Sequence, residues 1–575
     1  MHRRVMAFDF DGTIAENGIV PSGLQVALER LHSMGFVLFM ATGRRYGSVD
    51  FGPLRSLFTG IVWENGAVLY HTATDEVYLP FGCVDPQLIG ALKAADVPLE
   101  TGQAIASTWT PHEATVWRVV NEWGAEVMIA NNKGAVMILP AGTSKGAGLE
   151  RLLGLCGYSP RNLVAFGDGE NDLSLLELGE FGVAVSDAVP SVKNVADLVT
   201  TLPGPSGVLE VLETYWMNGL TPSIPLRRDR QILLGQDETG NPVYLPGAAL
   251  AGGNLGVFGD SGSGKSWVTG LLVEGMRHAG YQALIIDPEG DFKGLRALPG
   301  IVALEGNEKT LPSAAFVVAL LEMGNVTVVL DLCAYRVNHR IDYMAELLRE
   351  LRSLKERKFR PHWIVLEEAQ HFLPPNGSPA TVELVPMLAS GGWAFVSYRP
   401  DRLAIPVLER LNYCLLTRLT EPESVQTVCR VVGNSLGDES PADITRGFAW
   451  LCGKHRIRLR PNARRIPHIR HFYKYLDSPL PAHKRFYFRD DQGFLNLEAA
   501  SLFEFLQILP NLPIKSLSYH QARNDFAKWA EDALGDEGLA GHLRKLAHRQ
   551  LQGEALREAL LQRVANHHQE LQSLR

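Results

Sequence analysis

The chain has 575 residues, of which 46% are hydrophobic and 21% charged, and its formal net charge is −8 at pH 7. The length predicts roughly three or four domains, and the composition is that of an ordinary globular protein with sizeable cores. The negative charge excludes a surface that is basic overall, although it is compatible with a local basic track.

Cysteine usage and hydropathy bear on the compartment. The six cysteines are scattered and form no C-x-x-C pair, which fits a reducing compartment. The N-terminal segment runs directly into a predicted strand and does not resemble a signal peptide. No apolar run reaches the roughly 18 residues that a membrane span needs. We therefore expect a soluble, cytoplasmic protein without a membrane partner.

Two carboxylates follow the first predicted strand, residues 5–8. Asp9 and Asp11 are two positions apart, so in an extended chain they share one face and repel each other. A divalent cation would relieve that repulsion. The pair suits phosphoryl transfer, in which one carboxylate attacks phosphorus and the other handles the leaving-group proton. Alone, D-x-D-G-T is equally compatible with a turn of solvated acids.

Three further polar clusters follow predicted strands or precede a predicted helix. They are Thr42-Gly-Arg, Gly142-Thr-Ser-Lys-Gly and Gly167-Asp-Gly-Glu-Asn-Asp. The four clusters in this order resemble the haloacid dehalogenase-like (HAD) phosphatase superfamily. The Asn65-Gly-Ala segment and the G-x-S-K-G form of the third cluster resemble its Cof-type branch.

This resemblance implies a role for each matching residue. Asp9 would be the nucleophile that forms an aspartyl-phosphate, and Asp11 the general acid and base. Thr42 and Lys145 would hold and neutralise the phosphoryl group. The implied Mg²⁺ ligands are Asp9, Asp11, Asp168 and Asp172. Catalysis would then consist of positioning and electrostatic stabilisation.

The segment available for a substrate-reading cap is short. Phosphatases of this kind normally carry a cap between the second and third clusters, and here only about 68–139 is free for it. A small cap fits an open site for a bulky or macromolecular phosphate ester, or equally a minimal cap over a small substrate. Trp109, Trp117 and Trp123 could stack on a substrate or belong to the cap core.

A phosphate-binding loop stands near the middle of the chain. Residues 259–266, GDSGSGKS, match G-x-x-x-x-G-K-[ST] between a predicted strand and a predicted helix, which is the context that the motif requires. Lys265 can reach the β- and γ-phosphates, and the Ser266 hydroxyl can ligate Mg²⁺. The expected nucleotide-binding residues of the loop are Gly259, Ser261, Gly262, Ser263, Gly264, Lys265 and Ser266.

Polar residues also follow the later strands of this region. Asp287, the pair Glu367-Glu368 and Arg399 each come after an apolar run. Strands alternating with helices predict a doubly wound parallel sheet whose functional groups gather at the strands' carboxyl ends. Without the phosphate loop, the glutamate pair would read as a solvated helix start.

The order of these pieces, including D-P-x-G-[DE]-F from Asp287, resembles the HerA/FtsK-type ATPases. This implies hexameric rings that bind ATP and thread nucleic acid, with double-stranded DNA as a partner. Glu367 would take the Walker B position, and Glu368 would polarise the attacking water. Two positions depart from the pattern: Glu367 replaces the usual Asp, and Tyr398 replaces a sensor glutamine. We therefore expect ATP binding more firmly than fast hydrolysis.

Two features after the ATPase motifs leave alternatives open. Arg399 and Arg418 are candidate arginine fingers or ordinary arginines. The stretch 454–475 holds eight Lys or Arg and no acid, which fits either a nucleic-acid track or a subunit contact against an acidic neighbour. The remaining residues show helical periodicity and predict a helical accessory domain.

Together the motifs predict an α/β protein: a HAD Rossmann-like domain with a small cap (1–215), a linker (216–230), a P-loop ATPase with a doubly wound sheet (231–465) and a mostly helical domain (466–575). The leading hypothesis is a Mg²⁺-dependent phosphatase coupled to a ring-forming ATPase that acts on nucleic acid, in repair or defence. The alternative is a metabolic sugar or nucleotide phosphatase with a regulatory, oligomerising ATP-binding module.

Overall fold

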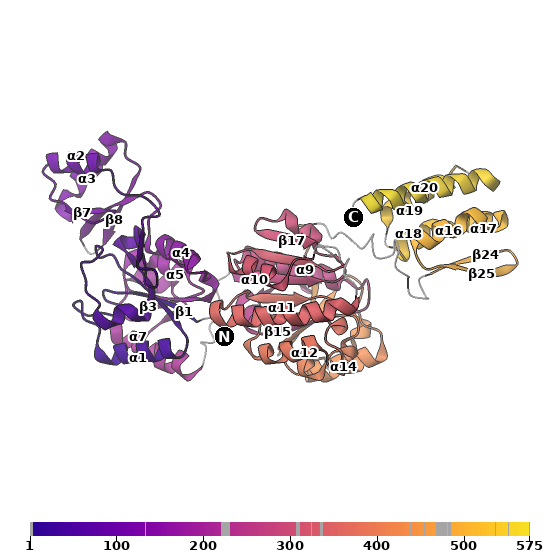
Figure 1. The fold of residues 1–575 in the computed structure, drawn as a ribbon, viewed down its shortest axis with the longest axis horizontal. Helices are drawn as coiled ribbons and strands as arrows, with labels where there is room; N and C mark the ends of the chain where they lie inside the picture. The colour runs from indigo at the N-terminus through magenta and orange to yellow at the C-terminus, as the bar shows by residue number, and fades with distance from the viewer. Residues whose placement is uncertain are drawn as a thin grey trace.

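The computed structural model has three bodies in chain order, each built around its own core (Figure 1). It describes residues 4–132, 134–219, 230–305, 311–323, 325–333, 337–436, 439–453, 455–466, 480, 485–534, 536–549 and 551–573. The architecture confirms the predicted fold class. Within the described residues, no helix combines the length and apolarity that crossing a bilayer requires.

The N-terminal sheet has the strand order β12-β11-β10-β1-β2-β3-β4-β5. Strands β12 to β3 run parallel, and β4 and β5 extend the sheet antiparallel. The strands are β1 (Val5–Asp9), β2 (Val37–Ala41), β3 (Phe58–Trp63), β4 (Val68–His71), β5 (Glu76–Tyr78), β10 (Leu163–Gly167), β11 (Phe181–Ala184) and β12 (Leu198–Val199). The helices are α1 (Ser22–Ser33), α4 (Lys145–Leu155), α5 (Leu173–Leu178), α6 (Pro190–Val195) and α7 (Gly204–Thr214).

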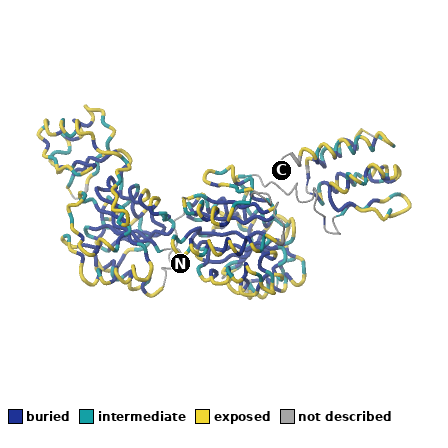
Figure 2. The backbone as a smooth tube through the Cα atoms, in the orientation of Figure 1, coloured by how far each residue is buried: buried dark blue, intermediate teal, exposed yellow. Residues whose placement is uncertain are grey.

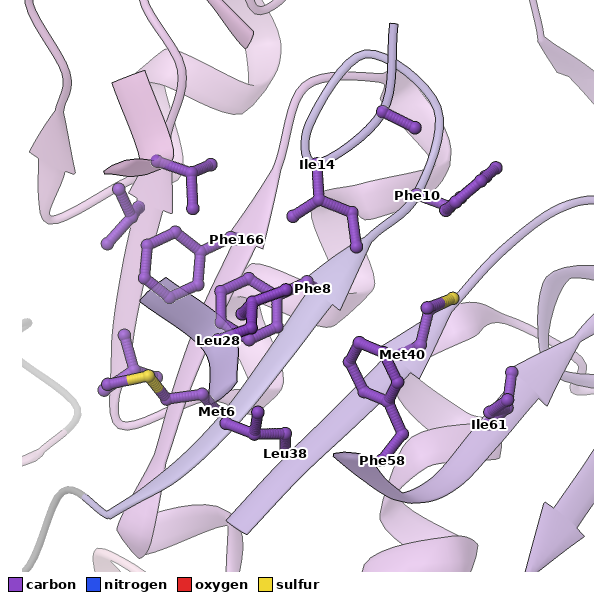
Figure 3. Close-up of a cluster of buried hydrophobic side chains, with 14 of the residues drawn as sticks. Met6, Phe8, Phe10, Ile14, Leu28, Leu38, Met40, Phe58, Ile61 and Phe166 are labelled. Carbon is purple, nitrogen blue, oxygen red and sulfur yellow. The ribbon is translucent and has the colours of Figure 1, made fainter. Parts of the chain in front are cut away.

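Side-chain alternation along β1 explains why helices cover both faces of this sheet. Met6 and Phe8 point into the cluster that includes α1 and α7 residues, and Phe8 stacks on Phe166 of β10 at 4.7 Å (Figure 3). Val5 and Ala7 point to the other face, into the cluster with α4 and α5 residues. A strand buried on both faces reads as a continuous apolar run, as this one does.

The cap is a four-stranded antiparallel sheet with two helices. Its strands, in the order β6-β7-β9-β8, are β6 (Glu100–Thr101), β7 (Ala106–Trp109), β9 (Ala135–Pro140) and β8 (Val127–Asn132), and its helices are α2 (Pro86–Ala94) and α3 (Glu113–Trp123). On β9, Ile138 packs in the cluster with α2 and α3, whereas Met137 and Leu139 pack on the core of the main domain. The cap is smaller than the predicted 68–139, because β4 and β5 pair with the main sheet instead.

The central sheet has the order β14-β13-β23-β22-β21-β15-β20-β19-β16-β18-β17. Its strands from β21 to β17 in that order are parallel. The strands are β13 (Gln231–Asp237), β14 (Pro242–Pro246), β15 (Asn254–Phe258), β16 (Ala283–Asp287), β17 (Ile301–Glu305), β18 (Thr327–Asp331), β19 (Trp363–Leu366), β20 (Trp393–Ser397), β21 (Tyr413–Leu416), β22 (Ala449–Cys452) and β23 (Arg456–Pro461).

Helices cover both faces of the central sheet, as Figure 2 illustrates by the buried strands between more exposed helices. They are α8 (Gly247–Gly252), α9 (Lys265–His278), α10 (Ala314–Glu322), α11 (Val337–Lys358), α12 (Pro379–Leu384), α13 (Ile405–Leu408) and α14 (Pro422–Val432). Helix α9 packs in one core cluster, and α10, α11 and α12 pack in the other. The doubly wound prediction is therefore confirmed.

The C-terminal body is a hairpin packed on helices around an aromatic core. Its elements are β24 (Phe486–Asp490), β25 (Gly493–Ala499), α16 (Leu502–Ile508), α17 (Ile514–Ala522), α18 (Asp525–Asp532), α19 (Glu537–Ala547) and α20 (Gly553–Ser573). Phe486 packs edge-on against Phe505 and Trp529, with centroids at 5.3 and 5.4 Å. The mostly helical prediction is confirmed.

Buried polar side chains join the first two bodies. The Tyr281 hydroxyl donates to Glu180 Oε1 at 2.6 Å, and Arg230 Nη1 donates to the Glu180 carbonyl at 2.6 Å. His362 Nε2 lies 3.2 Å from Asn162 Oδ1. All five residues are at most 2% exposed. We call this set the junction; the predicted linker falls mainly on 220–229, outside the described residues.

Candidate functional site

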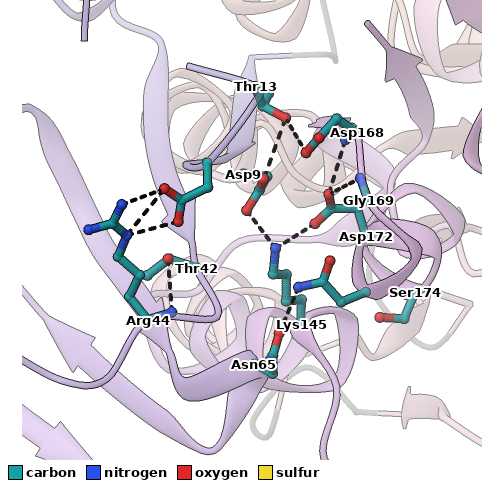
Figure 4. Close-up of polar contacts among 12 residues, drawn as sticks. Asp9, Thr13, Thr42, Arg44, Asn65, Lys145, Asp168, Gly169, Asp172 and Ser174 are labelled. Atoms are coloured by element: carbon teal, nitrogen blue, oxygen red, sulfur yellow. Dashed lines mark hydrogen bonds and ion pairs between the residues drawn. The ribbon is translucent and has the colours of Figure 1, made fainter. Parts of the chain in front are cut away.

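The first candidate site lies at the carboxyl edge of the N-terminal sheet (Figure 4). Strand β1 ends at Asp9, and its parallel neighbour β10 is followed directly by Asp168. Asp172 lies in the 3-10 helix Glu170–Asp172. Ligand oxygens of these three carboxylates lie within 4.8 Å of one another. Three converging carboxylates form a donor set that suits Mg²⁺.

Lys145 connects two of these carboxylates. Its Nζ lies 2.5 Å from Asp9 Oδ1 and 2.7 Å from Asp172 Oδ1, and the side chain is 2% exposed. Burial alone would lower the pKa of Lys145, but Asp172 and Asp9 raise it above its ordinary value. Burial and then Asp172 hold the pKa of Asp9 well above its usual range, despite Lys145. The lysine thus offsets only part of the negative charge, and the remainder favours a bound cation.

Asp11, predicted as a metal ligand, is not part of this carboxylate cluster. Arg44 donates to it through Nη2 at 2.7 Å and Nε at 2.9 Å, and the Asp11 side chain is 44% exposed. Thr42 is fully buried, and its Oγ1 accepts the Arg44 N–H at 3.1 Å. The structure therefore gathers Asp9, Lys145 and the later acids, while the Asp11 carboxylate turns to Arg44.

Two residues that the motifs did not assign support this region: Thr13 contacts the acids of the site, and Glu64 holds the cap. The Thr13 hydroxyl lies 3.5 Å from Asp9 Oδ2 and 3.4 Å from Asp168 Oδ1. The position of Thr13 in the D-x-D-G-T motif is the sequence feature that could have predicted this contact. Glu64 is fully buried and accepts four backbone N–H groups, from Tyr46, Gln103, Ala104 and Ile105, at 2.8–3.2 Å. Glu64 thereby holds the segment before β7 of the cap against the main domain. No local sequence pattern predicts this role.

The cap contacts the site through an amide pair. Asn171 Nδ2 donates to Asn65 Oδ1 at 2.9 Å, and Asn65 Nδ2 contacts Met137 Sδ of β9 at 2.8 Å. The cap tryptophans Trp109, Trp117 and Trp123 are between 45% and 57% exposed. None of the three belongs to the cap core, so that alternative was wrong.

The second candidate site follows β15, between its parallel neighbours β20 and β21. The loop turns at Gly262 (φ 76°) and Gly264 (φ 108°), conformations that favour glycine. A Cβ on Gly259 would lie 1.9 Å from Thr417 Oγ1. Ser261 is exposed, and Ser263 Oγ donates to the Asp260 carbonyl.

Lys265 and Ser266 open α9 beside a cluster of acids. Lys265 Nζ donates to the Asp260 carbonyl at 3.0 Å, and Ser266 Oγ donates to Asp291 Oδ2 at 2.9 Å. Asp287 holds the turn that carries Asp291, because its oxygens accept three backbone N–H groups from that turn. Asp291 is the fifth residue of the D-P-x-G-[DE]-F element that starts at Asp287, and the motifs alone assigned it no role. The set fits a Mg²⁺ ion beside a phosphate chain.

Burial and mutual repulsion perturb these acids. The pKa of Asp287 is raised to about 7 by burial and then by Asp291. The pKa of Glu367 is raised well above its usual range by burial, followed by Asp291 and Glu368. Crowded acids of this kind, placed after parallel strands, are typical of functional sites.

The structure shows the surroundings of both candidate arginine fingers. Arg399 makes two 2.9 Å hydrogen bonds to Asp401 and lies within 3.8 Å of Glu421 and Glu423. Its guanidinium is thus paired with acids of its own chain. Arg418 is exposed, and its carbonyl accepts from Asp260 of the loop.

Part of the basic stretch is neutralised within the chain. Arg456 pairs with Glu439 at 2.8 Å, Arg458 with Glu238 at 3.2 Å, and the buried Arg464 with Glu274 at 2.9 Å. Lys454 and residues 467–475 lie outside the described residues. The described arginines therefore offer less free positive charge than the sequence indicated.

Comparisons with known proteins match both parts of the chain. Residues 117–212 match the haloacid dehalogenase-like hydrolase family, and residues 233–364 match the central domain of helicase HerA. Phosphoglycolate phosphatase 2 of Saccharolobus solfataricus is 28% identical over 214 residues, covering 36% of this chain and 91% of that protein. Phosphoglycolate phosphatase of Nitrosopumilus maritimus is 28% identical over 228 residues, covering 37% and 96%. A solved haloacid dehalogenase-like hydrolase from Bacteroides thetaiotaomicron is 20% identical with a TM-score of 0.34, covering 37% and 98%.

Fold, acid clusters and family matches together define a hydrolase of mixed α/β architecture. Its N-terminal part is a haloacid dehalogenase-like hydrolase domain, and its central part is a HerA-type P-loop ATPase domain in the same chain. Both resemblances drawn from the motifs are confirmed.

Proposed function

We propose that the N-terminal domain is a Mg²⁺-dependent phosphatase for small phosphoric monoesters and that the central domain hydrolyses ATP. The observation that carries the first part is the buried cluster of Asp9, Asp168 and Asp172 with Lys145. The names of the matched relatives, phosphoglycolate phosphatases, favour a small substrate.

In the proposed reaction, an Asp9 oxygen attacks phosphorus while the ester oxygen leaves with its electron pair. Lys145 neutralises charge on the transferring group, and Thr42 holds it. Asp11 gives the leaving oxygen a proton, which requires it to loosen its contact with Arg44. Water, deprotonated by Asp11, then attacks the aspartyl-phosphate, and inorganic phosphate and free Asp9 result. Bound Mg²⁺, held by Asp9, Asp168 and Asp172, would supply charge neutralisation.

Phosphate release from phosphoglycolate and from p-nitrophenyl phosphate tests this assignment. We expect Asp9→Asn to abolish release in the presence of Mg²⁺ while the rate of ATP hydrolysis stays unchanged. Asp85→Asn, which alters a helix cap on the cap domain, serves as the matched control and should retain activity. If Asp9→Asn still releases phosphate, Asp9 is not the nucleophile. If the wild-type protein releases phosphate in the presence of EDTA, the reaction does not depend on Mg²⁺.

A second candidate concerns what the ATPase does. The match to the HerA central domain favours a hexameric ring that moves double-stranded DNA, in repair or defence, with the phosphatase coupled to it. ATP hydrolysis that rises severalfold with duplex DNA would support this candidate. A rate unchanged by DNA, in an oligomer that still binds ATP, would instead favour a regulatory ATP-binding module.

A further inference from the structure

Gln370 is hydrogen-bonded on both sides just after the acid pair of β19. It lies in the 3-10 helix Ala369–His371 and is 7% exposed. Its Nε2 donates to Glu368 Oε2 at 2.5 Å, and its Oε1 accepts from Ser397 Oγ at 2.6 Å. Ser397 is the fully buried last residue of β20. Strands β19 and β20 are parallel neighbours, so their carboxyl ends bring the three side chains together.

The chemistry of the partners determines the direction of this chain of bonds. The Ser397 hydroxyl already accepts the Arg399 backbone N–H at 3.0 Å, so its own proton is free to go to Gln370. An ionised Glu368 carboxylate can only accept. The amide of Gln370 must therefore turn its carbonyl to Ser397 and its NH₂ to Glu368. A side chain that both donates and accepts through separate atoms is required at this position.

Glu368 has particular need of such a restraint. Its backbone is in the left-handed region (φ 48°), and its side chain is half-buried. A glutamate has three rotatable bonds, so an unrestrained carboxylate would sample several orientations. Tyr398, next to Ser397, cannot supply an amide. The amide reaches Glu368 from Gln370 instead, two residues further along the same segment.

We propose that Gln370, anchored by Ser397, is the positioning residue that orients the Glu368 carboxylate toward the attacking water. This inference rests on the proposed ATPase function. Displacing a catalytic group by about 1 Å can lower a rate by about 100-fold. Because the proposed action is on orientation alone, the binding of ATP should be preserved when the amide is lost.

Steady-state ATP hydrolysis by the full-length protein tests the proposal. Gln370→Met keeps the size of the side chain and removes both hydrogen bonds. We expect it to lower kcat by about 10- to 100-fold, with KM for ATP and the affinity for a fluorescent ATP analogue within about twofold. Ser397→Ala removes the anchor of Gln370 together with the acceptor of the Arg399 backbone N–H, and it should lower kcat by a smaller factor because the bond from Gln370 to Glu368 remains. Gln426→Met, the same change at an exposed site on α14, should be silent.

A double-mutant cycle separates positioning from folding. If Gln370 acts through Glu368, then adding Gln370→Met to Glu368→Gln will cause no further loss in single-turnover hydrolysis. Two outcomes would overturn the role of Gln370 and leave the proposed ATPase mechanism standing. One is that the losses from Glu368→Gln and Gln370→Met are additive. The other is that Gln370→Met and Ser397→Ala both keep a normal kcat while Glu368→Gln is inactive. An active Glu368→Gln, or a wild-type protein that binds ATP without hydrolysing it, would overturn the proposed ATPase mechanism and this inference with it.

Discussion

Glu64 illustrates how one side chain can determine the geometry of a distant element. Its two oxygens accept four backbone N–H groups, and three of these donors belong to the consecutive residues Gln103, Ala104 and Ile105. Gly102 precedes them, and a Cβ there would lie 2.4 Å from Glu64 Oε1. A carboxylate is the only side-chain group of this size that offers two oxygens without a proton, so this contact is specific for glutamate.

Glu64→Gln should therefore loosen the cap. The new NH₂ group would face N–H donors instead of accepting from them, which leaves buried donors unpaired at a cost of about 1–3 kcal/mol. We expect faster limited proteolysis near residues 102–105 and a severalfold higher KM for the phosphate ester. Glu76→Gln, at an exposed position on β5, is the control. An unchanged cleavage pattern would show that the clamp does not hold the cap.

At the scale of elements, the phosphate loop depends on backbone conformation more than on side-chain contact. Gly264 is the N-cap residue of α9 and has φ 108°, and a Cβ there would meet no atom within 4 Å. At position 264, glycine is therefore required by the left-handed backbone conformation and not by a close contact. Any other residue would favour negative φ and turn the N–H groups of the loop away from a phosphate.

Gly264→Ala should weaken ATP binding about tenfold or more, since left-handed alanine costs about 1–2 kcal/mol. Phosphate-ester hydrolysis at the other site should be unaffected. Gly240→Ala offers a matched comparison, because Gly240 also has positive φ (86°) and open space but lies in the β13–β14 hairpin. Titration with a fluorescent ATP analogue measures both variants. Equal loss of binding in the two would contradict a local effect on the loop.

The elements were largely predictable, and the interactions between distant residues were not. Apolar runs followed by acids predicted the strands that end at Asp9 and Asp287 and the strand that precedes Glu367, because parallel strands are buried on both faces and place their polar ends together. The Asp11 carboxylate pairs with Arg44 outside the cluster of Asp9, Asp168 and Asp172, and motif spacing contains no information on this competing partner. Glu64 acts through partners 18–41 positions away, and Gln370 is anchored by Ser397, 27 positions away; no local pattern encodes such pairs.

At the scale of the whole molecule, the junction joins the starting ends of strands from two domains. Asn162 directly precedes β10, and His362 directly precedes β19. His362 Nδ1 accepts the Gln282 N–H at 2.8 Å, so the ring is neutral with its proton on the nitrogen that faces Asn162. Burial, followed by Arg360 and Arg161, holds the pKa of His362 well below its usual range.

This neutral histidine predicts acid sensitivity. The folded protein keeps His362 unprotonated, whereas the unfolded chain binds a proton below about pH 6.5. The contribution of the neutral His362 to the free energy of unfolding is therefore complete above that pH. It is lost as the pH falls, by up to about 1.4 kcal/mol per pH unit. Thermal unfolding at pH 7.5, 6.5 and 5.5 should show a smaller drop in Tm for His362→Gln than for wild type. His371→Gln, at an exposed site, should follow wild type; parallel curves for all three proteins would exclude His362 as the cause.

The burial of Glu180 has a consequence for how this fusion can evolve. This carboxylate is fully buried, and besides Arg161 of its own domain, at 3.2 Å, it contacts Tyr281 and Arg230 from beyond the first domain. A freestanding first domain with the same sequence would lose Tyr281 and Arg230 and keep only Arg161 beside this acid, and a freestanding central domain would lose the acceptor of the Tyr281 hydroxyl. The two domains are therefore not independently exchangeable. Replacing either one with a homologue requires matched changes on both sides of the junction.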